Sequence, residues 1–440
     1  MPKTRPPQQW PERSHNDQLH EAIANVSIDR AVTLLSIGGI DIEHESEGFT
    51  PLMAAAGKGS RGLVRILLNN GASASKKSSV DESTALHLAA IYGHDAEVIE
   101  MLVKAGANID EVDRHGRTAL HHAAANGYSE VMRVLIKIGA NINSRSPGDG
   151  ETPLQAAAMN GQLGAVRVLL ASKANPRLKL NGIKYAAGPL EGAAQEGHSE
   201  VVREMLQQVG IEGCGGPTVG VAALYEAAKN QHVDIMAILT DAGVVDTGTA
   251  LVGAAACGRE ASTRFLLRQQ EKRRTADRRA YLNSACVISG ATPMVYGIGF
   301  GRYCDSRIVR LLVDAGADTA SVVHLTGPWG QACFSGTPLD FANDALRGKM
   351  IAGQPATEEQ LRRLEAIRRL LSRVEAVQAV SWLWLRNYYG IGHAESYERG
   401  HEASSRIGTQ LKEMLPILRR RARRRSVLCA ALFRWGVVFC

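Results

Sequence analysis

Aromatic residues are scarce in this sequence of 440 residues: Phe, Trp and Tyr together make up 5% of it, whereas apolar residues make up 45%. A hydrophobic core must therefore be built mainly from Leu, Val, Ile and Ala. The sequence also lacks the combination of low hydrophobicity and high net charge that keeps a chain disordered, because only 22% of its residues are charged. We expect most of the chain to fold.

Long apolar runs and paired cysteines are missing as well. No run approaches the ~20 apolar residues that a membrane-spanning helix needs, and the nearest candidate, residues 427–439, contains Arg434. Residues 1–18 are polar and Pro-rich, without the apolar region of a secretory signal. The seven cysteines lie far apart, and no C-x-x-C occurs, which disfavours a disulfide framework or a zinc module. We therefore predict a cytoplasmic or nuclear protein, or one present in both compartments, that is not secreted and has no transmembrane helix.

Catalytic and metal-binding motifs are absent too. The glycine-rich segment Gly297–Gly301 superficially looks like a nucleotide-binding loop. However, no G-K-[ST] follows it, and no strand pattern precedes it. The adjacent His121 and His122 point to different faces of a helix, so they do not form a metal pair by spacing. An enzyme would need a site in the irregular residues 270–335, where no catalytic constellation is found. We predict no enzyme, and no catalytic residue, cofactor, metal or small-molecule substrate.

Most of the chain has no excess of charge of either sign. The formal net charge is +7, but residues 401–440 hold nine Lys or Arg and two Glu, which accounts for all of it. The first 400 residues are therefore neutral overall. This distribution disfavours a protein that binds nucleic acid along its whole length.

What the sequence does contain is a repeat with a period of 34 residues. Four segments begin with Thr, then Pro or Ala, then Leu, and end in two or three Ala: Thr50–Ala56, Thr84–Ala90, Thr118–Ala124 and Thr152–Ala158. Each is followed three residues later by Gly and then by an apolar stretch, and most repeats end in Gly-Ala. Self-similarity at such a period is typical of repeat architectures.

The residues of one repeat predict two short helices. Thr50 suits the N-cap of the first helix, and Pro51 suits its first position, where no N–H is needed. Gly59 ends that helix, the second helix places Leu67 on an apolar face, and Gly71 suits a left-handed C-cap. Neither helix is long enough to be stable alone, so we expect each repeat to be stabilised by stacking on its neighbours.

This pattern closely resembles the ankyrin repeat, whose period and T-P-L-H-x-A signature it matches. The resemblance implies an all-α solenoid of stacked helix-turn-helix units with short hairpin loops, about eight to ten units including degenerate ones. It also implies a structural role for His87 and His121, which would hydrogen-bond between units. The function that it implies is a non-catalytic scaffold or adaptor that binds other proteins.

The quality of the repeat declines along the chain and suggests a division into segments. We expect residues 1–15 to be a disordered Pro-rich N-terminus and residues 16–375 to be the solenoid, with a capping unit near Leu19. Within the solenoid, the regular repeats cover about residues 48–243 and the degenerate repeats about 249–375. We expect residues 376–400 to be an aromatic-rich cap segment and residues 401–440 to be a basic, disordered tail.

The binding surface is predicted from the residues that packing does not require. The two residues before each motif Gly would project onto the concave surface of the stacked repeats. They mix apolar, amide and charged side chains, as binding patches do. Predicted interaction residues are Lys58, Ile91, Tyr92, Asn126, Met159, Asn160, Gln195, Glu196, Lys229 and Asn230.

Two segments after the repeats leave alternatives open. The aromatic cluster Trp382–Tyr389 could seal the apolar end of the solenoid or anchor a partner. The basic tail carries Arg419, Arg420, Arg421, Arg423, Arg424 and Arg425. These residues fit a nuclear-import or nucleic-acid patch, a polybasic contact with an anionic membrane, or a tail without a specific role. An alternative function is therefore a regulator whose localisation the tail directs.

Overall fold

The computed structural model describes residues 14–37, 39–180, 188–271, 275–286, 289–300, 305–326, 332–348, 350–351, 354–355 and 357–389. Almost all of the described residues that form regular secondary structure are helical. The chain divides into two compact units. Unit 1 comprises Met1–Leu224 and Asp234–Val245, and unit 2 comprises Tyr225–Val233 and Asp246–Cys440.

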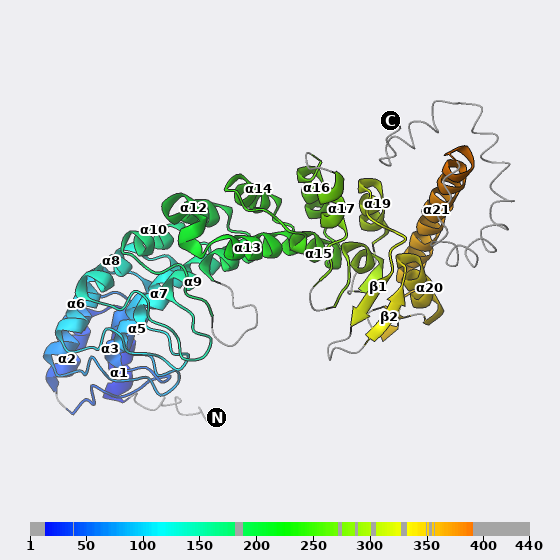
Figure 1. The fold of residues 1–440 in the computed structure, drawn as a ribbon. Coiled ribbons are helices and arrows are strands. Elements are labelled where there is room, and N and C mark those ends of the chain that lie inside the picture. The colour runs from blue at the N-terminus through cyan, green and yellow to red at the C-terminus, as the bar shows by residue number, and fades with distance from the viewer. Residues whose placement is uncertain are drawn as a thin grey trace, which may run out of the picture. The chain divides into compact units, whose positions relative to one another are not determined.

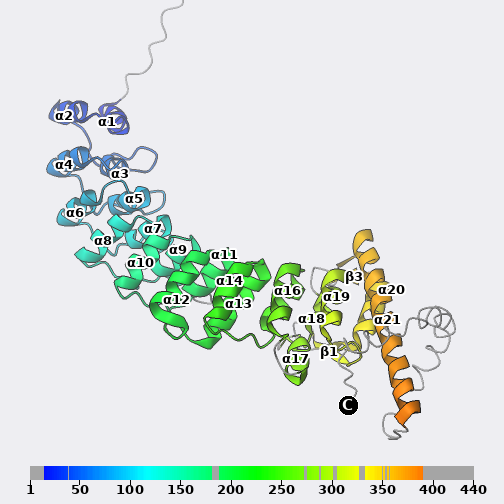
Figure 2. The same ribbon diagram turned by 90° about the horizontal axis from the view of Figure 1, so that it is seen from above.

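Unit 1 is built from short helices in consecutive pairs (Figure 1). The first helices of the pairs form what we call the inner row: α1 (His15–Ala24), α3 (Pro51–Gly57), α5 (Ala85–Tyr92), α7 (Ala119–Asn126), α9 (Pro153–Met159) and α11 (Pro189–Glu196). The second helices form the outer row: α2 (Ile28–Ile37), α4 (Arg61–Asn69), α6 (Ala96–Lys104), α8 (Ser129–Ile138), α10 (Leu163–Ala171) and α12 (Ser199–Cys214). Helices of each row pack on the next helix of the same row, as Figure 2 shows from above.

The local sequence explains where the inner helices begin and end. The Thr50 hydroxyl accepts a hydrogen bond from the Met53 amide at 3.3 Å, and Pro51 occupies the first helical position, which confirms the predicted cap. Gly93 ends α5 and Gly127 ends α7, both with left-handed backbone. The outer helix α4 begins after Ser60, whose side chain accepts from the Leu63 amide.

The core lies between the two rows and repeats with the sequence. Leu52, Leu86, Leu120 and Leu154 of the inner row are each 1% exposed. Facing leucines of the outer row, such as Leu67, are fully buried. Burying one such side chain stabilises the fold by about 1.5–3 kcal/mol. Because the small Ala side chains keep successive inner helices close, one continuous core replaces the separate cores that single repeats are too short to form.

The pattern changes at the end of unit 1. The outer helix α12 has a non-helical residue inside it, Gly210 (φ 66°, ψ 175°), and then continues to Cys214. The following helix, α13 (Pro217–Asn230), is 14 residues long, whereas α3, α5, α7, α9 and α11 have seven or eight residues. Its residues up to Leu224 belong to unit 1 and the rest to unit 2. Helix α14 (Val233–Asp241) follows.

Unit 2 contains a second set of stacked helices. They are α15 (Thr249–Ala256), α16 (Glu260–Gln269), α17 (Thr275–Leu282), α18 (Pro293–Val295), the π-helical turn η1 (Tyr296–Phe300), α19 (Ser306–Ala315), α20 (Pro338–Gly348) and α21 (Glu358–Tyr389). Helix α15 packs on α18 and η1, which contact α20, whereas α16 packs on α19, which contacts α21. The two rows of unit 1 thus have a counterpart in unit 2.

Two short antiparallel ribbons interrupt these helices. Strands β1 (Val323–Thr326) and β2 (Ala332–Gly336) pair with Leu325 opposite Phe334, and a bulge follows Leu325. Leu325 lies in a small core with Ala291 and Val295, against which Phe334 packs. The second ribbon pairs β3 (Met350–Ile351) with β4 (Gln354–Pro355).

The last described helix, α21, begins after a capping box and continues beyond the expected end of the solenoid. Thr357 and Gln360 form a capping box, in which the Thr357 amide donates to Gln360 Oε1 at 2.9 Å and the Gln360 amide donates to Thr357 Oγ1 at 3.3 Å. The helix then runs without a break to Tyr389. It therefore crosses the expected boundary between residues 375 and 376, because no Gly or Pro lies between Thr357 and Tyr389 to end it.

Candidate functional site

Each inner helix from α3 to α11 is fixed by the side chain at its third position. The His87 ring accepts a hydrogen bond from the Thr84 amide at Nδ1 (3.1 Å), so its Nε2 carries the proton and donates to the Arg117 carbonyl at 3.1 Å. His121 repeats this arrangement between the Thr118 amide and the Glu151 carbonyl, at 3.1 and 3.0 Å. Both rings link one repeat to the loop of the next, which confirms the structural role predicted for them.

Burial keeps these rings neutral. Removal from water lowers the pKa of His121 to about 4 and also lowers the pKa of His87. The neighbouring His122 lies 2.8 Å from the Asp113 carboxylate, but burial outweighs that contact and lowers its pKa too. The three imidazoles therefore serve the scaffold at neutral pH, as neutral hydrogen-bonding groups rather than as charges.

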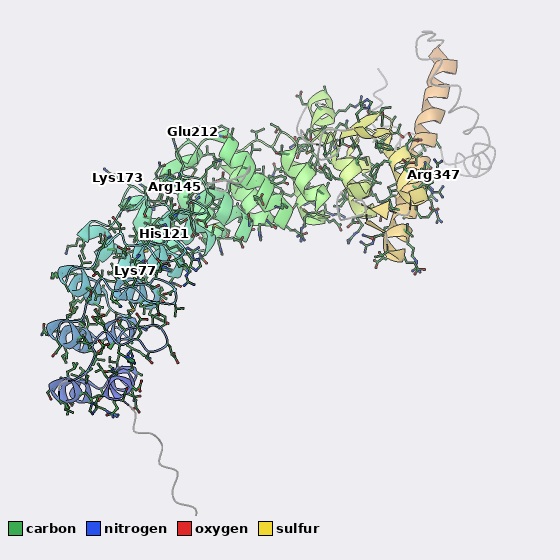
Figure 3. The ribbon with its side chains drawn as sticks, turned by 90° about the horizontal axis from the view of Figure 1, so that it is seen from below. Lys77, His121, Arg145, Lys173, Glu212 and Arg347 are labelled. Carbon is green, nitrogen blue, oxygen red and sulfur yellow. The ribbon has the colours of Figure 1, made fainter. Side chains whose placement is uncertain are left out.

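Polar contacts also tie the loops of successive repeats together, and two of the residues that make them, Lys77 and Arg145, are labelled in Figure 3. The Lys77 ammonium lies 2.6 Å from the Glu111 carboxylate and donates to the Val112 carbonyl at 3.1 Å. Arg145 donates to the Lys179 carbonyl at 2.6 Å. These cross-links hold the loops beside the inner row, so the surface between loops and helices is preorganised.

A groove of about 840 Å³ lies on this surface, over the first three inner helices. Its floor is apolar and includes Met53 of α3 and Leu88 of α5, both buried. Phe49, in the loop before α3, and the exposed ring of Tyr92 add aromatic surface. We call this site the N-terminal groove; its lining residues are Asp17, His20, Glu21, Ala24, Ser46, Glu47, Phe49, Met53, Ala54, Gly57, Lys58, Leu88, Tyr92 and His94.

The position of Tyr92 depends on a glycine in the preceding repeat. A Cβ added to Gly57 would lie 3.3 Å from the Tyr92 ring, so the ring covers the bare backbone of α3. On its other side Tyr92 stacks on His94, with the ring centroids 6.3 Å apart and the planes 2° from parallel. The ring is 52% exposed and held between two neighbours, which suits it to contact a ligand.

The charges of the groove are mostly negative. Asp17, Glu21 and Glu47 contribute three carboxylates, against the single ammonium of Lys58. The Ser14 hydroxyl, which donates to Asp17, lowers the pKa of that carboxyl. Glu21 lies 3.4 Å from Arg30 in a partly exposed pair. An apolar floor with an acidic rim can bind a basic, partly apolar peptide. Among the lining residues, no nucleophile lies beside a base.

The predicted interaction residues divide between the N-terminal groove and other places. Lys58 and Tyr92 line the groove, and Ile91 lies half-buried beside Tyr92. Asn126 is exposed and donates to the His122 carbonyl at 3.0 Å. Half-buried Met159 lies over Gly192 of the next inner helix, where an added Cβ would be 2.7 Å from its Cγ.

The remaining predicted residues lie outside the groove. Asn160 is exposed and donates to the Ala156 carbonyl at 2.8 Å, and Gln195 donates to Glu196 at 3.0 Å. Lys229 and Asn230 belong to unit 2, where both are half-buried and contact Glu226. None of these five residues is part of the lining of the groove.

Sequence reasoning missed most of the groove. The residues from α1, such as Asp17 and His20, stand in the segment predicted as a capping unit. Met53 and Leu88 lie one helical turn before Gly57 and Tyr92, so they share their face, but both stand within the Thr-to-Ala motif of the repeat, from which no interaction residue is predicted. The 3.6-residue period places them beside Tyr92 and is the signal that would have found them.

Other candidate features carry no site. A smaller groove of about 540 Å³ in unit 2 is lined by Leu346 of α20 and by one face of α21. Its charged side chains pair along the helix, as Arg362 does with Glu358 and Arg369 with Glu365. Across the residues that the structure describes, no cluster of three or more His, Cys, Asp or Glu is placed to hold a metal ion, and no helix is long and apolar enough to cross a membrane. The side chains of Trp382–Tyr389 and the six arginines between 419 and 425 in the basic tail lie outside the described residues.

Comparison with known proteins matches part of the chain. A family model for three copies of ankyrin repeats matches residues 19–113, 61–146, 95–182 and 138–214. Over 85 residues, 19% of this chain, the sequence is 41% identical to the E3 ubiquitin-protein ligase XBAT33 of Arabidopsis thaliana and 35% identical to alpha-latrotoxin-Lg1a of Latrodectus geometricus. Over 114 residues, 26% of this chain, it is 33% identical to the neurogenic locus notch homolog protein 1 of Xenopus laevis. The matches span 16%, 6% and 4% of those relatives, respectively.

Proposed function

Because residues 19–214 are ankyrin repeats, which generally bind other proteins, we propose that this chain is a non-catalytic scaffold or adaptor for a partner protein. The partner binds the inner row, with the N-terminal groove as the centre of the contact. The observation that supports this most directly is the groove itself, where an apolar floor with Tyr92 meets a rim of charge. Interfaces commonly combine an apolar core with a polar rim.

The rigidity of the inner row favours this function. The caps and the histidine links fix the helices, and the contacts of Lys77 and Arg145 fix the loops. A partner that binds such a preformed surface orders few groups, so less free energy is lost on association. A site of this kind needs no catalytic residue, and the lining contains no constellation that would act as one.

A double substitution tests this proposal. Tyr92→Lys with Met159→Lys adds two charges to the inner row at positions that the fold leaves accessible or half-buried. We expect capture of partner proteins from a cell extract, quantified by mass spectrometry, to fall by tenfold or more while the circular dichroism spectrum stays unchanged. A buried apolar anchor at an interface accounts for a loss of this size.

The control introduces a single lysine on the outer row. Val32 of α2 is 45% exposed, close to the value for Tyr92, and lies outside the lining of the groove. Val32→Lys should leave capture unchanged. Equal capture by the double variant and the wild type would show that partners bind elsewhere.

The basic tail supports a second role, in localisation. Its six arginines within seven residues provide a charge density that import factors, nucleic acid or an anionic membrane attract. Deleting residues 419–440 and imaging the chain in cells tests this role. A changed distribution between nucleus, cytoplasm and membrane is the expected result, and an unchanged distribution would contradict it.

A further inference from the structure

The N-terminal groove begins at the same helix into which residues 1–13 lead. Asp17, Glu21 and Ala24 of α1 form one wall of the groove, and α1 is capped by Ser14, the first described residue. Residues 1–13 are therefore joined covalently to the wall of the site. The effective concentration of residues 1–13 at the groove is therefore high.

The composition of residues 1–13 complements that of the groove. Their sequence, MPKTRPPQQWPER, carries Lys3, Arg5 and Arg13 against Glu12, whereas the groove carries three carboxylates against Lys58. Trp10 matches the apolar floor, because a large aromatic ring gains most from burial against other apolar and aromatic side chains. Opposite charge and apolar surface thus favour the same pairing.

The length of the segment also fits. Four of these 13 residues are proline, which favours an extended polyproline helix that rises about 3.1 Å per residue, so the segment spans about 40 Å. Packed helices lie about 8–10 Å apart, which puts α5 about 20 Å from α1. Trp10, four residues before Ser14, reaches about 12 Å from the start of α1, far enough to lie over α3. Proline also restricts the free segment, so that less conformational entropy is lost when it binds.

We propose that residues 1–13 of this chain bind in the N-terminal groove and compete there with the partner protein. This inference rests on the proposed function of the groove and concerns how partner binding is regulated. The partner must displace residues 1–13 before it can bind. A short tether gives an effective concentration in the millimolar range. A segment that binds as a free peptide with a Kd near 100 µM would therefore occupy the groove about nine-tenths of the time.

The test measures how a fluorescent peptide of residues 1–13 binds to two forms of the protein. One is the full chain, and the other lacks residues 1–13 but keeps the Ser14 cap; circular dichroism checks that both fold alike. We expect fluorescence anisotropy to show binding to the shortened chain, and at least tenfold weaker binding to the full chain, whose own segment competes. No binding to the shortened chain, or equal binding to both forms, would overturn the proposal.

Substitutions then locate the peptide. In the shortened chain, Glu47→Lys with Tyr92→Lys should weaken peptide binding by tenfold or more, whereas Val32→Lys on the outer row should leave it unchanged. A peptide with Trp10→Ala should bind at least fivefold more weakly. A peptide of residues 417–427, which contains the Arg run of the basic tail without a Trp, controls for charge alone; binding as tight as that of residues 1–13 would also overturn the proposal.

The failure of this inference is distinguishable from the failure of the proposed function. The peptide assay contains no partner protein, so its result stands whether or not a partner uses the groove. If Tyr92→Lys with Met159→Lys abolishes capture while the peptide does not bind, the groove is a partner site without self-occupancy. If the peptide binds while capture is unaffected by those substitutions, the segment occupies the groove but the proposed function is wrong.

Discussion

At the scale of single residues, one position shows how different side chains do the same structural work. The third residue of five successive inner helices is Met53, His87, His121, Gln155 and Glu191. In each case its side chain accepts from the backbone amide of the residue before the helix. This position therefore requires a buried hydrogen-bond acceptor, which several residue types can provide. A single histidine at this position is consequently weak evidence for a catalytic or metal-binding role.

The pH dependence of stability follows from this position. Burial holds the pKa of His121 at about 4, below the ~6.5 of the unfolded chain. Between these values the unfolded chain binds a proton that the folded chain does not. The contribution of His121 to the free energy of unfolding is therefore complete above pH 6.5 and is lost as the pH falls toward 4. At the lower limit the loss is about 3 kcal/mol.

His121→Gln tests this effect, because Gln155 makes the same amide contact one repeat later, at 2.8 Å. We expect the decrease in unfolding free energy between pH 7.5 and pH 4.5, measured by urea denaturation, to be about 2 kcal/mol smaller in the variant. His87 and His122 remain, so some pH dependence persists. His94→Gln, at an exposed ring, is the control and should keep the wild-type profile. A wild-type profile in His121→Gln would show that the folded ring takes up the proton.

At the scale of elements, the glycines that end helices have unequal surroundings. Gly71, after α4, has φ +89° and no atom within 4 Å of an added Cβ, whereas Gly93, after α5, has φ +65° and an added Cβ 2.3 Å from the Tyr128 ring. Both positions require left-handed backbone, but only Gly93 also requires the missing side chain. It allows Tyr128 of the next repeat to pack on the end of α5.

The two glycines predict a graded pair of variants. Gly71→Ala should cost about 1–2 kcal/mol, the penalty for a Cβ in left-handed backbone. Gly93→Ala should cost about 2–4 kcal/mol, because displacing Tyr128 adds the cost of overpacking. Urea denaturation of both variants measures the difference. Equal losses would indicate that Tyr128 moves aside freely.

The sequence predicted the regular elements better than the irregular ones, for a physical reason. Helices α3 to α10 have Thr or Ser caps, Gly ends or apolar faces in a strict register, so each boundary has a local chemical cause. The break at Gly210 inside α12 and the greater length of α13 depend on how the last repeats of unit 1 pack. The β1–β2 ribbon likewise depends on contacts of Leu325 with Ala291 and Val295, more than 25 residues away in the sequence.

At the scale of the whole molecule, the candidate site shows the same limit. The prediction of stacked, all-helical ankyrin repeats is confirmed for residues 19–214, and it placed Lys58 and Tyr92 on the inner row. The groove itself needs three helices and a loop at once, and Phe49 and His20 enter it only through the stacking of α1, α3 and α5. A periodic pattern indicates which face is accessible. It does not indicate where along the inner row the side chains leave space for a groove.

The distribution of charge gives a prediction about the whole chain. The formal net charge of +7 and the pI of about 9.0 come from residues 401–440, since the first 400 residues carry no net charge. Deleting residues 401–440 should abolish retention on immobilised heparin at pH 7 and low salt. Substituting Gln for the six arginines between 419 and 425 should remove most of the retention, because each cation that pairs with the polymer releases counterions. Elution of the wild type should shift strongly with salt. Undiminished retention of the deleted chain would contradict this assignment and place an anion-binding surface on the helical repeats.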